Sequence, residues 1–262
     1  MQTMIFLHAI VGAILSAQRV EVSLSGFDDK DFPKALNEIS VIAVEWNKLK
    51  REHIDNREFF SEPNGHRPFE GWVKTTYPNG NIKLLFNVKT GIRNGPCFSW
   101  YESGQKQSHC LYREGKSHGE TNYWYENGQQ FFKHNYNHGE LEGRSEIWYF
   151  NGQLQCLSEN INGQLISTEV WKIDGKKCST TNFKGGDGII AFYNFRTGVE
   201  YARENFQNGV RHGPTTIWYE NGNKKSVRNY KRGQQDGLSI FYNENGSVKE
   251  QVVYKDGKRV EN

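Results

Sequence analysis

The hydrophobic positions of the chain change their spacing twice. Residues 4–17, MIFLHAIVGAILSA, form an uncharged apolar run. From Phe32 to His53 the apolar positions fall at steps of three and four, the spacing of an amphipathic helix. From Phe69 onward, short runs rich in Trp, Tyr, Phe and Ile alternate with Asn-Gly or His-Gly pairs, which is typical of β-hairpins. The pattern therefore predicts an apolar leader, one helix and a long series of strands.

The apolar run at residues 4–17 is too short to cross a bilayer comfortably, and it ends in small residues before Gln18. It resembles the hydrophobic core of a secretory signal peptide with a cleavage site after Ala17. We therefore expect export to the periplasm, the cell envelope or the medium. Alternatively, residues 4–17 are an uncleaved anchor or a buried first element of the fold. If the segment is not cleaved, we expect the protein in the cytoplasm.

The helical stripe has start signals of its own. Asp31 is a candidate N-terminal cap, and Pro33 lies in the first turn, where proline is tolerated. We expect this helix to cover an open end of the following sheet, because a bare sheet edge invites aggregation. A helix that binds a partner is the alternative. The stripe consists of Phe32, Leu36, Ile39, Ala43, Trp46 and Leu49.

A repeat of about 24 residues fills the chain from about Phe69 to the C-terminus. Each of its eight units has a turn glycine, and a second glycine follows eleven residues later in every unit. Two turn signals per unit imply two strands per unit, so we expect an all-β fold, an elongated single antiparallel sheet of stacked hairpins. The expected organisation is a signal peptide at 1–17, a helical cap and linker at 18–68, and repeats at 69–262. The turn glycines are Gly80, Gly104, Gly128, Gly152, Gly175, Gly198, Gly222 and Gly246.

Pro78 indicates the type of the first turn. It suits the second position of a type I turn followed by Gly80 in a G1 bulge. A bulge shifts the strand register by one, so we expect Cys97 and Cys110 in the next unit to point to opposite faces and to remain unbridged. A two-residue loop at the next turn would instead place the two cysteines opposite each other. No cysteine has a CxxC or CxxH spacing, which argues against a zinc site.

The unit that follows Gly152 matches the repeat worst. Ser167 replaces a glycine, and Ile173 with Asp174 replaces the usual Glu-Asn turn. We expect a kink or bulge of the sheet over residues 160–195. A catalytic cleft at this irregular unit, using Asp174 or Asp187, is the alternative that would make the protein a hydrolase or toxin.

Composition and charge exclude several classes of protein. The 262 residues are 35% hydrophobic but 14% aromatic, which argues against wholesale disorder and against several membrane-spanning helices. The net charge of +3 comes from 33 basic and 30 acidic side chains, without the concentration of basic charge expected of a nucleic-acid binder. We expect no nucleic-acid partner.

The candidate chemistry is sparse. In several units a third glycine follows the second by four residues, as at Gly95 and Gly119. The position before it holds His118, His212, Asn94, Glu142 or Asp236, a set that indicates hydrogen bonding in a turn rather than catalysis. His134 and His138 have a spacing that binds metal only on a helix, and they lie in a strand and turn region. Glu102, Glu126 and Glu220 recur in the turns. Catalysis by two carboxyl groups needs a pair with different pKa values, which a repetitive edge seldom provides. We expect no enzyme, no cofactor and no metal.

Trp-Tyr pairs are the strongest candidate for a binding site. Adjacent strand residues point to opposite faces, so one ring of each pair should pack and the other should lie at a more open face. The rings either stabilise a thin sheet or form a groove for a peptide, a strand or a sugar chain. The pairs are Trp100 with Tyr101, Trp124 with Tyr125, Trp148 with Tyr149, and Trp218 with Tyr219.

The repeated unit resembles a known repeat. Residues 124–128, WYENG, and residues 115–119, GKSHG, are similar to the MORN repeat, especially to its bacterial variant form in proteins described as YwqK-type antitoxins. The resemblance implies a non-enzymatic protein-interaction scaffold of stacked hairpins with a protein partner, antitoxin-like or associated with the cell envelope. A binder of envelope glycans or lipid head groups is the alternative, so membrane or glycan contact stays open, as do the partner's identity and the oligomeric state.

Overall fold

The computed structural model describes residues 32–54, 57–65 and 67–260, and the predicted signal peptide lies outside them. The chain divides into two compact units, Met1–Ile42 and Ala43–Asn262. The described part of the first unit is helix α2 (Phe32–Ile42). The expected helix to His53 is therefore half as long as predicted. β-Branched residues at 41, 42 and 44 disfavour its continuation, and the chain enters strand β1 (Val44–Glu45) instead.

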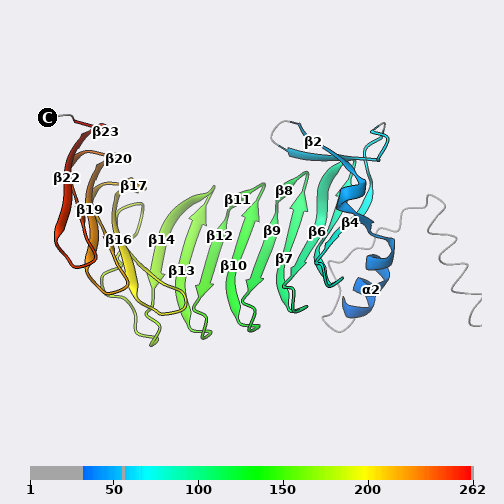
Figure 1. Ribbon diagram of the computed structural model, residues 1–262, viewed down its shortest axis with the longest axis horizontal. Coiled ribbons are helices and arrows are strands. Elements are labelled where there is room, and N and C mark those ends of the chain that lie inside the picture. The colour runs from blue at the N-terminus through cyan, green and yellow to red at the C-terminus, as the bar shows by residue number, and fades with distance from the viewer. Residues whose placement is uncertain (1–31, 55–56, 66, 261–262) are drawn as a thin grey trace, which may run out of the picture. The chain divides into compact units, whose positions relative to one another are not determined.

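The second unit is all-β, as predicted, and its strands follow one another in chain order (Figure 1). A short segment comes first: β1, the 3₁₀-helix η2 (Trp46–Lys48), β2 (Lys50–Ile54) and β3 (Arg57–Ser61). A 12-stranded sheet joins β1 to β4 (Gly71–Thr76), β5 (Ile82–Lys89), β6 (Ile92–Trp100), β7 (Lys106–Arg113), β8 (Lys116–Ser117), β9 (Gly119–Trp124), β10 (Gln130–Asn137), β11 (Glu140–Leu141), β12 (Gly143–Trp148), β13 (Leu154–Ile161) and β14 (Gln164–Val170). A 9-stranded sheet holds β15 (Gly188–Tyr193), β16 (Glu200–Gln207), β17 (Val210–Arg211), β18 (Gly213–Trp218), β19 (Lys224–Lys231), β20 (Gln234–Gln235), β21 (Gly237–Tyr242), β22 (Val248–Lys255) and β23 (Lys258–Arg259).

Two kinds of turn alternate along the sheets. At one edge, two-residue turns such as Glu114-Gly115 have positive φ at both positions, 50° and 78°, which is the type I′ geometry of tight hairpins. At the other edge, the Gly80 N–H donates to the Tyr77 backbone carbonyl at 2.9 Å, and the Tyr77 N–H donates to the Asn81 backbone carbonyl at 2.8 Å. Pro78 therefore occupies the second position of a turn closed by a glycine bulge, as predicted.

The expectation that Cys97 and Cys110 face opposite ways is wrong. The glycine bulge forms at the turn between β6 and β7, but a second bulge follows at Gln107, because Trp100 pairs with Lys106 while Ser99 pairs with Ser108. Two single-residue shifts restore the original alternation. Cys97 and Cys110 are therefore directly opposite each other on one face, and the structure records both as free thiols.

The irregular unit interrupts the strand pairing. The turn at Gly175 keeps the hydrogen bonds of the other turns, because the Gly175 N–H donates to the Lys172 carbonyl at 2.9 Å. The residues after this turn form no regular strand, and the isolated bridge between Trp171 and Lys177 takes the place of a strand pair. β14 is linked to the segment that precedes β15 by the isolated bridge between Ser167 and Lys184 and by the Gly185 N–H, which donates to the Ile166 carbonyl at 2.7 Å. The irregularity predicted for residues 160–195 thus divides the expected single sheet into two hydrogen-bonded sheets.

Hydrogen bonds between successive units hold the stack together along both edges. At the type I′ edge, Gly139 N–H donates to the Ser117 carbonyl at 2.8 Å, and the same bond recurs from unit to unit. At the opposite edge, Asn127 Nδ2 donates to the Phe150 carbonyl at 3.0 Å. Each hairpin is therefore fixed to the next at its two ends as well as by its strands.

Candidate functional site

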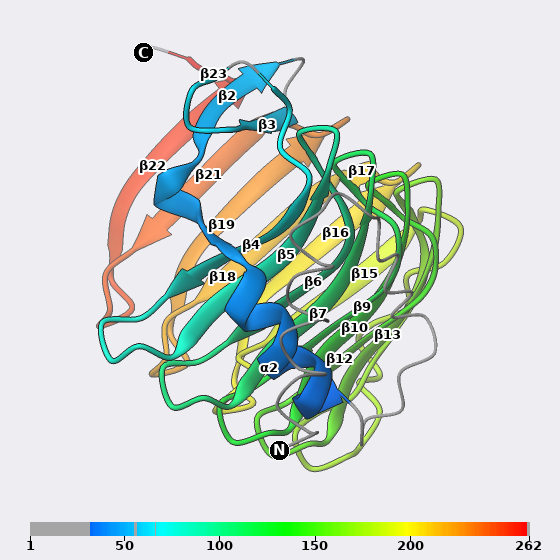
Figure 2. The same ribbon diagram turned by 90° about the vertical axis from the view of Figure 1, so that its right-hand side faces the viewer.

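The described residues between β1 and β4 fold over one face of the 12-stranded sheet. We call residues 46–54, 57–65 and 67–69 the cap, and the face it covers, which bears Val73 and Phe86, the capped face. Figures 1 and 2 both show the β2–β3 hairpin across the ends of the first strands, at the edge of the two-residue turns. Phe60 N–H donates to the Gly91 carbonyl at 2.7 Å, and Gly91 N–H donates to the Phe69 carbonyl at 2.9 Å. The cap is thus hydrogen-bonded to the turn between β5 and β6.

The capped end of this face is a true hydrophobic core. Phe60 is fully buried, and its ring lies 5.4 Å from that of Phe86 and 5.9 Å from that of Trp46, in the tilted and edge-on geometries that aromatic pairs prefer. Arg93 donates to Glu58 of the cap at 3.0 Å and places its guanidinium 4.3 Å from the Phe86 ring. The buried cluster consists of Leu49, Phe60, Val73, Phe86, Val88, Cys97 and Cys110.

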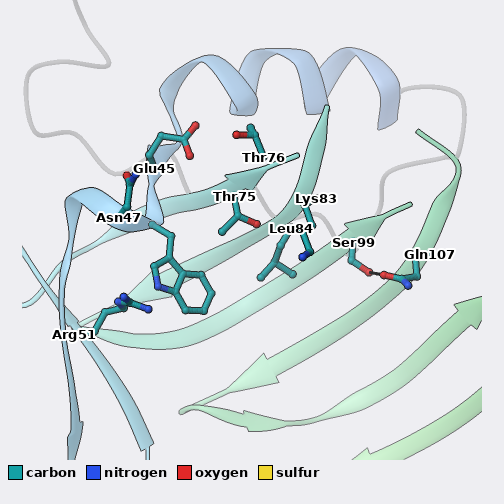
Figure 3. A pocket seen from close by; sticks show the side chains of 10 residues that line it. Glu45, Asn47, Arg51, Thr75, Thr76, Lys83, Leu84, Ser99 and Gln107 are labelled. Atoms are coloured by element: carbon teal, nitrogen blue, oxygen red, sulfur yellow. Dashed lines mark hydrogen bonds between the residues drawn. The ribbon is translucent and has the colours of Figure 1, made fainter. Parts of the chain in front are cut away.

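A hollow of about 660 Å³ lies where the cap ends (Figure 3). Asn47 and Arg51 line it from the cap, and Thr75, Leu84 and Ser99 line it from three neighbouring strands of the capped face. The Ser99 hydroxyl donates to Gln107 at 3.1 Å on its far side. The covered part of the face therefore gives way to an uncovered part at this hollow.

Beyond the hollow, the same face carries half-buried rings and Ile147, none of which belongs to the core cluster beneath the cap. The Tyr123 and Phe132 rings stack at 4.3 Å, and the Phe132 and His134 rings stack at 4.6 Å. Strand pairing continues the row that lines the hollow into these side chains, because Ser99 pairs with Ser108, Ser108 pairs with Tyr123, and Phe132 pairs with both Tyr123 and Ile147. We call this set the open stripe: Tyr123, Phe132, His134, Tyr136 and Ile147.

The tyrosines of the Trp-Tyr pairs are held by the fold. Each hydroxyl donates to a backbone carbonyl in the next unit, about one repeat further along the chain. Tyr149 is fully buried and Tyr125 is 5% exposed, which leaves little of either ring for a ligand. The bonds are Tyr101 to Trp124 at 2.9 Å, Tyr125 to Trp148 at 2.7 Å, Tyr149 to Trp171 at 2.9 Å and Tyr219 to Tyr242 at 2.9 Å.

The tryptophans of the pairs point away from the open stripe. Trp124 directly follows Tyr123 in β9, so the two rings lie on opposite faces of the sheet. Trp100 is buried, whereas Trp124, Trp148 and Trp218 are half-buried. The Lys106 ammonium lies 4.8 Å from the Trp124 ring, and Arg203 lies 5.4 Å from that of Trp218. Two of these rings already have a cation of the chain over them. Sequence reasoning singled out the pairs but missed the open stripe, four of whose five members lie in the single hairpin β9–β10.

Three of the five side chains at the position before the third glycine make the turn hydrogen bonds predicted for it, whereas His118 Nδ1 is buried without a hydrogen-bond partner. The Asn94 side chain accepts from Glu114 N–H at 3.2 Å, Glu142 accepts from Asn162 N–H at 2.9 Å, and Asp236 accepts from Asp256 N–H at 3.3 Å. The donor in each case is a turn residue with positive φ in the next unit. These side chains therefore tie one type I′ turn to the next.

The two aspartates considered for catalysis are engaged in turns as well. Asp174 Oδ1 accepts from Lys176 N–H at 3.0 Å, and this bond lowers the pKa of Asp174. Asp187 Oδ1 accepts from Asn208 N–H at 2.7 Å.

Within the residues that the structure describes, no group of three or more His, Cys, Asp or Glu side chains is arranged to hold a metal ion. No helix in that part of the chain is long and apolar enough to cross a membrane.

Comparison with known families identifies the repeat in three segments. The MORN repeat variant model matches residues 93–114, 211–232 and 235–256. Each segment covers one hairpin of the structure: β6 with β7, β18 with β19, and β21 with β22. No curated protein matches the chain.

Proposed function

Because the chain is a protein of MORN-variant repeats, we propose that it is a protein-interaction scaffold that holds an extended segment of another protein on the open stripe. MORN repeats point to a repeat scaffold, often one that binds proteins or membrane lipids, and the family is generally non-enzymatic. The choice of a protein segment as the partner, and of this stripe as its site, is our proposal.

The cap is the observation that carries the proposal. It is an extended segment of protein that buries this same face by placing Phe60 and Leu49 over the rows of β4–β7. The open stripe continues the adjoining row of that face and offers stacked rings, and aromatic anchors supply much of the binding energy at protein interfaces. A partner segment with aromatic or aliphatic side chains in alternation would cover the stripe as the cap covers the core.

Binding of glycans or lipid head groups would use the opposite face, where the half-buried tryptophans lie. Lys106 over Trp124 and Arg203 over Trp218 occupy the positions that a cationic head group would take. This arrangement favours a protein partner over a glycan or a lipid head group.

We further propose that the chain is exported, which would make an envelope protein the partner. An antitoxin-like role would instead require retention in the cytosol with the toxin.

Site-specific photo-crosslinking in the cells that make the protein tests the proposed site. A benzophenone amino acid replaces Phe132 in one variant and Lys133, its neighbour on the opposite face, in the control. We expect protein adducts from position 132 and none of the same mass from position 133. Lipid or glycan adducts, adducts from position 133 alone, or no adduct at either position would overturn the proposal.

The intact mass of the recovered protein and its cell fraction test the proposed export. A chain that begins at Gln18 in an envelope or secreted fraction is the expected result. A full-length chain in the cytosol would contradict export and favour the antitoxin-like role.

A further inference from the structure

Two thiols meet beneath the cap. Cys97 of β6 and Cys110 of β7 are directly opposite partners of one antiparallel hairpin. Opposed residues of such a pair have Cα atoms roughly 4.5–5.5 Å apart, which lies within the range of about 4.4–6.8 Å that disulfides span. Their side chains leave the same face, and the Cys110 thiol donates to the Cys97 carbonyl at 3.6 Å. The hairpin thus needs no backbone shift to bring the two sulfur atoms together.

The surroundings of the pair favour a reactive thiolate at one position. A side-chain hydrogen bond from the Cys110 thiol lowers the pKa of the Cys97 thiol against the effect of burial, and the charge of Arg93 acts in the same direction. The same hydrogen bond and burial raise the pKa of Cys110. The two thiols are therefore unequal, with Cys97 the better nucleophile.

The other two cysteines lack such a partner. Cys156 pairs with Ile147 and Val170 across its neighbouring strands. Its thiol is 3.0 Å from the Thr168 hydroxyl, and the Cys178 thiol is 3.2 Å from the Tyr193 hydroxyl. Neither Cys156 nor Cys178 is paired with a cysteine across the strands, so they provide an internal control.

We propose that Cys97 and Cys110 are a redox pair that closes to a cross-strand disulfide by exchange with a low-molecular-weight disulfide such as oxidised glutathione. The Cys97 thiolate attacks one sulfur of that disulfide and releases one glutathione thiolate, which takes up a proton. The Cys110 thiol then loses its proton and attacks the Cys97 sulfur, releasing the second glutathione. Two protein thiols are oxidised and one small disulfide is reduced to two thiols.

The cap controls when this reaction takes place. Cys97 is 4% and Cys110 is 6% exposed, and both belong to the cluster that contains Phe60 and Leu49 of the cap. Small disulfides therefore reach the pair before the cap folds onto the sheet or while it is open. Once the disulfide has formed, it joins β6 to β7 beneath the cap, and the side chains of the cap shield it from reductants.

Refolding of the full-length wild-type chain with oxidised and reduced glutathione tests the proposal. Tryptic digestion without reduction is expected to release residues 94–106 linked to residues 107–113, because cleavage after Lys106 separates the two cysteines. The linked product should weigh about 2 Da less than the sum of the two free peptides. The folded, oxidised protein should unfold at a higher urea concentration than its reduced form.

A pair of variants makes the assignment specific. The double variant Cys156→Ser/Cys178→Ser is expected to lose about 2 Da on oxidation and to leave no thiol that can be alkylated in denaturant. The double variant Cys97→Ser/Cys110→Ser is expected to keep both remaining thiols. The proposal is overturned if wild-type peptides 94–106 and 107–113 stay unlinked at every glutathione ratio, if they end only as glutathione adducts, or if either cysteine links to Cys156 or Cys178 instead.

Discussion

One face of the sheet has two different surroundings along its length. Between β4 and β7 its centre is built from aliphatic side chains, Phe86 and two cysteines, and the cap buries this cluster. Between β9 and β12 the same face holds half-buried rings, including Tyr123, His134 and Tyr136. The backbone repeats but the side chains do not. Mainly apolar groups occur where the chain covers itself, and rings with a polar group occur where water reaches part of them, because such rings tolerate both environments.

The largest expected difference is between a buried and an open phenylalanine. Phe60→Ala is expected to cost about 3–5 kcal/mol of unfolding free energy, because it leaves a cavity between Trp46 and Phe86. Phe132→Ala should cost only about 1 kcal/mol, since its ring is partly in water. Urea unfolding of both variants measures the difference, and equal costs would erase the distinction between the capped and the open regions.

A second comparison isolates the fit of the cap to the sheet. Gly91→Ala and Gly80→Ala both place a side chain at a positive φ, which costs roughly 1–2 kcal/mol. A Cβ at Gly91 would also collide with the Phe59 ring, whereas nothing lies within 4 Å of a Cβ at Gly80. Gly91→Ala should therefore lose a further 1–3 kcal/mol or so in urea unfolding. Equal losses would mean that the cap does not rest on this turn.

The tyrosine hydroxyls should contribute to stability outside the cap as well. Tyr149→Phe removes the donor to the Trp171 carbonyl at a fully buried site, and we expect it to cost about 1–2 kcal/mol. Tyr101→Phe removes the same bond at a half-buried site and should cost less. Thermal unfolding of the two variants checks the order. The reverse order would contradict a structural role for these bonds.

The smallest expected effect is a pH dependence within the open stripe. Burial lowers the pKa of His134 below its ordinary value, so the unfolded chain takes up a proton at this residue more readily than the folded protein. The contribution of His134 to stability is therefore fully present above the unfolded pKa, near 6.5, and is lost as the pH falls toward the folded value. His134→Phe should flatten this part of the stability profile between about pH 7 and 5. An unchanged slope would show that His134 titrates as freely in the fold as in the unfolded chain.

The sequence was most informative where structure depends on neighbouring residues. Pro78 with Gly80 identified the turn type, and the mixed set Asn94, Glu142 and Asp236 identified the hydrogen bonds between turns. Both features depend on local backbone geometry, which a repeated motif reports directly.

Features that depend on distant contacts were not predictable in this way. The bulge at Gln107 has no marker residue, and without it the two cysteines had to be placed on opposite faces. Trp46 and Leu49 fit a helical stripe, yet they belong to the cap core because Phe60 and Phe86 offer them a place to pack. The open stripe was missed because Tyr123 and Phe132 become opposite partners only through the register shift between Gln130 and Phe132 in the β9–β10 hairpin, which no residue marks.

The most direct test of the account is the affinity of the partner segment captured at position 132, measured with the purified protein. Phe132→Glu places a charge in the middle of the open stripe and should weaken binding by about 30-fold or more at a temperature where a cooperative urea transition shows that the variant is folded. Lys133→Glu, on the opposite face, should leave the affinity unchanged. Equal affinities for the wild type and Phe132→Glu would contradict the claim that the uncovered face is the binding surface.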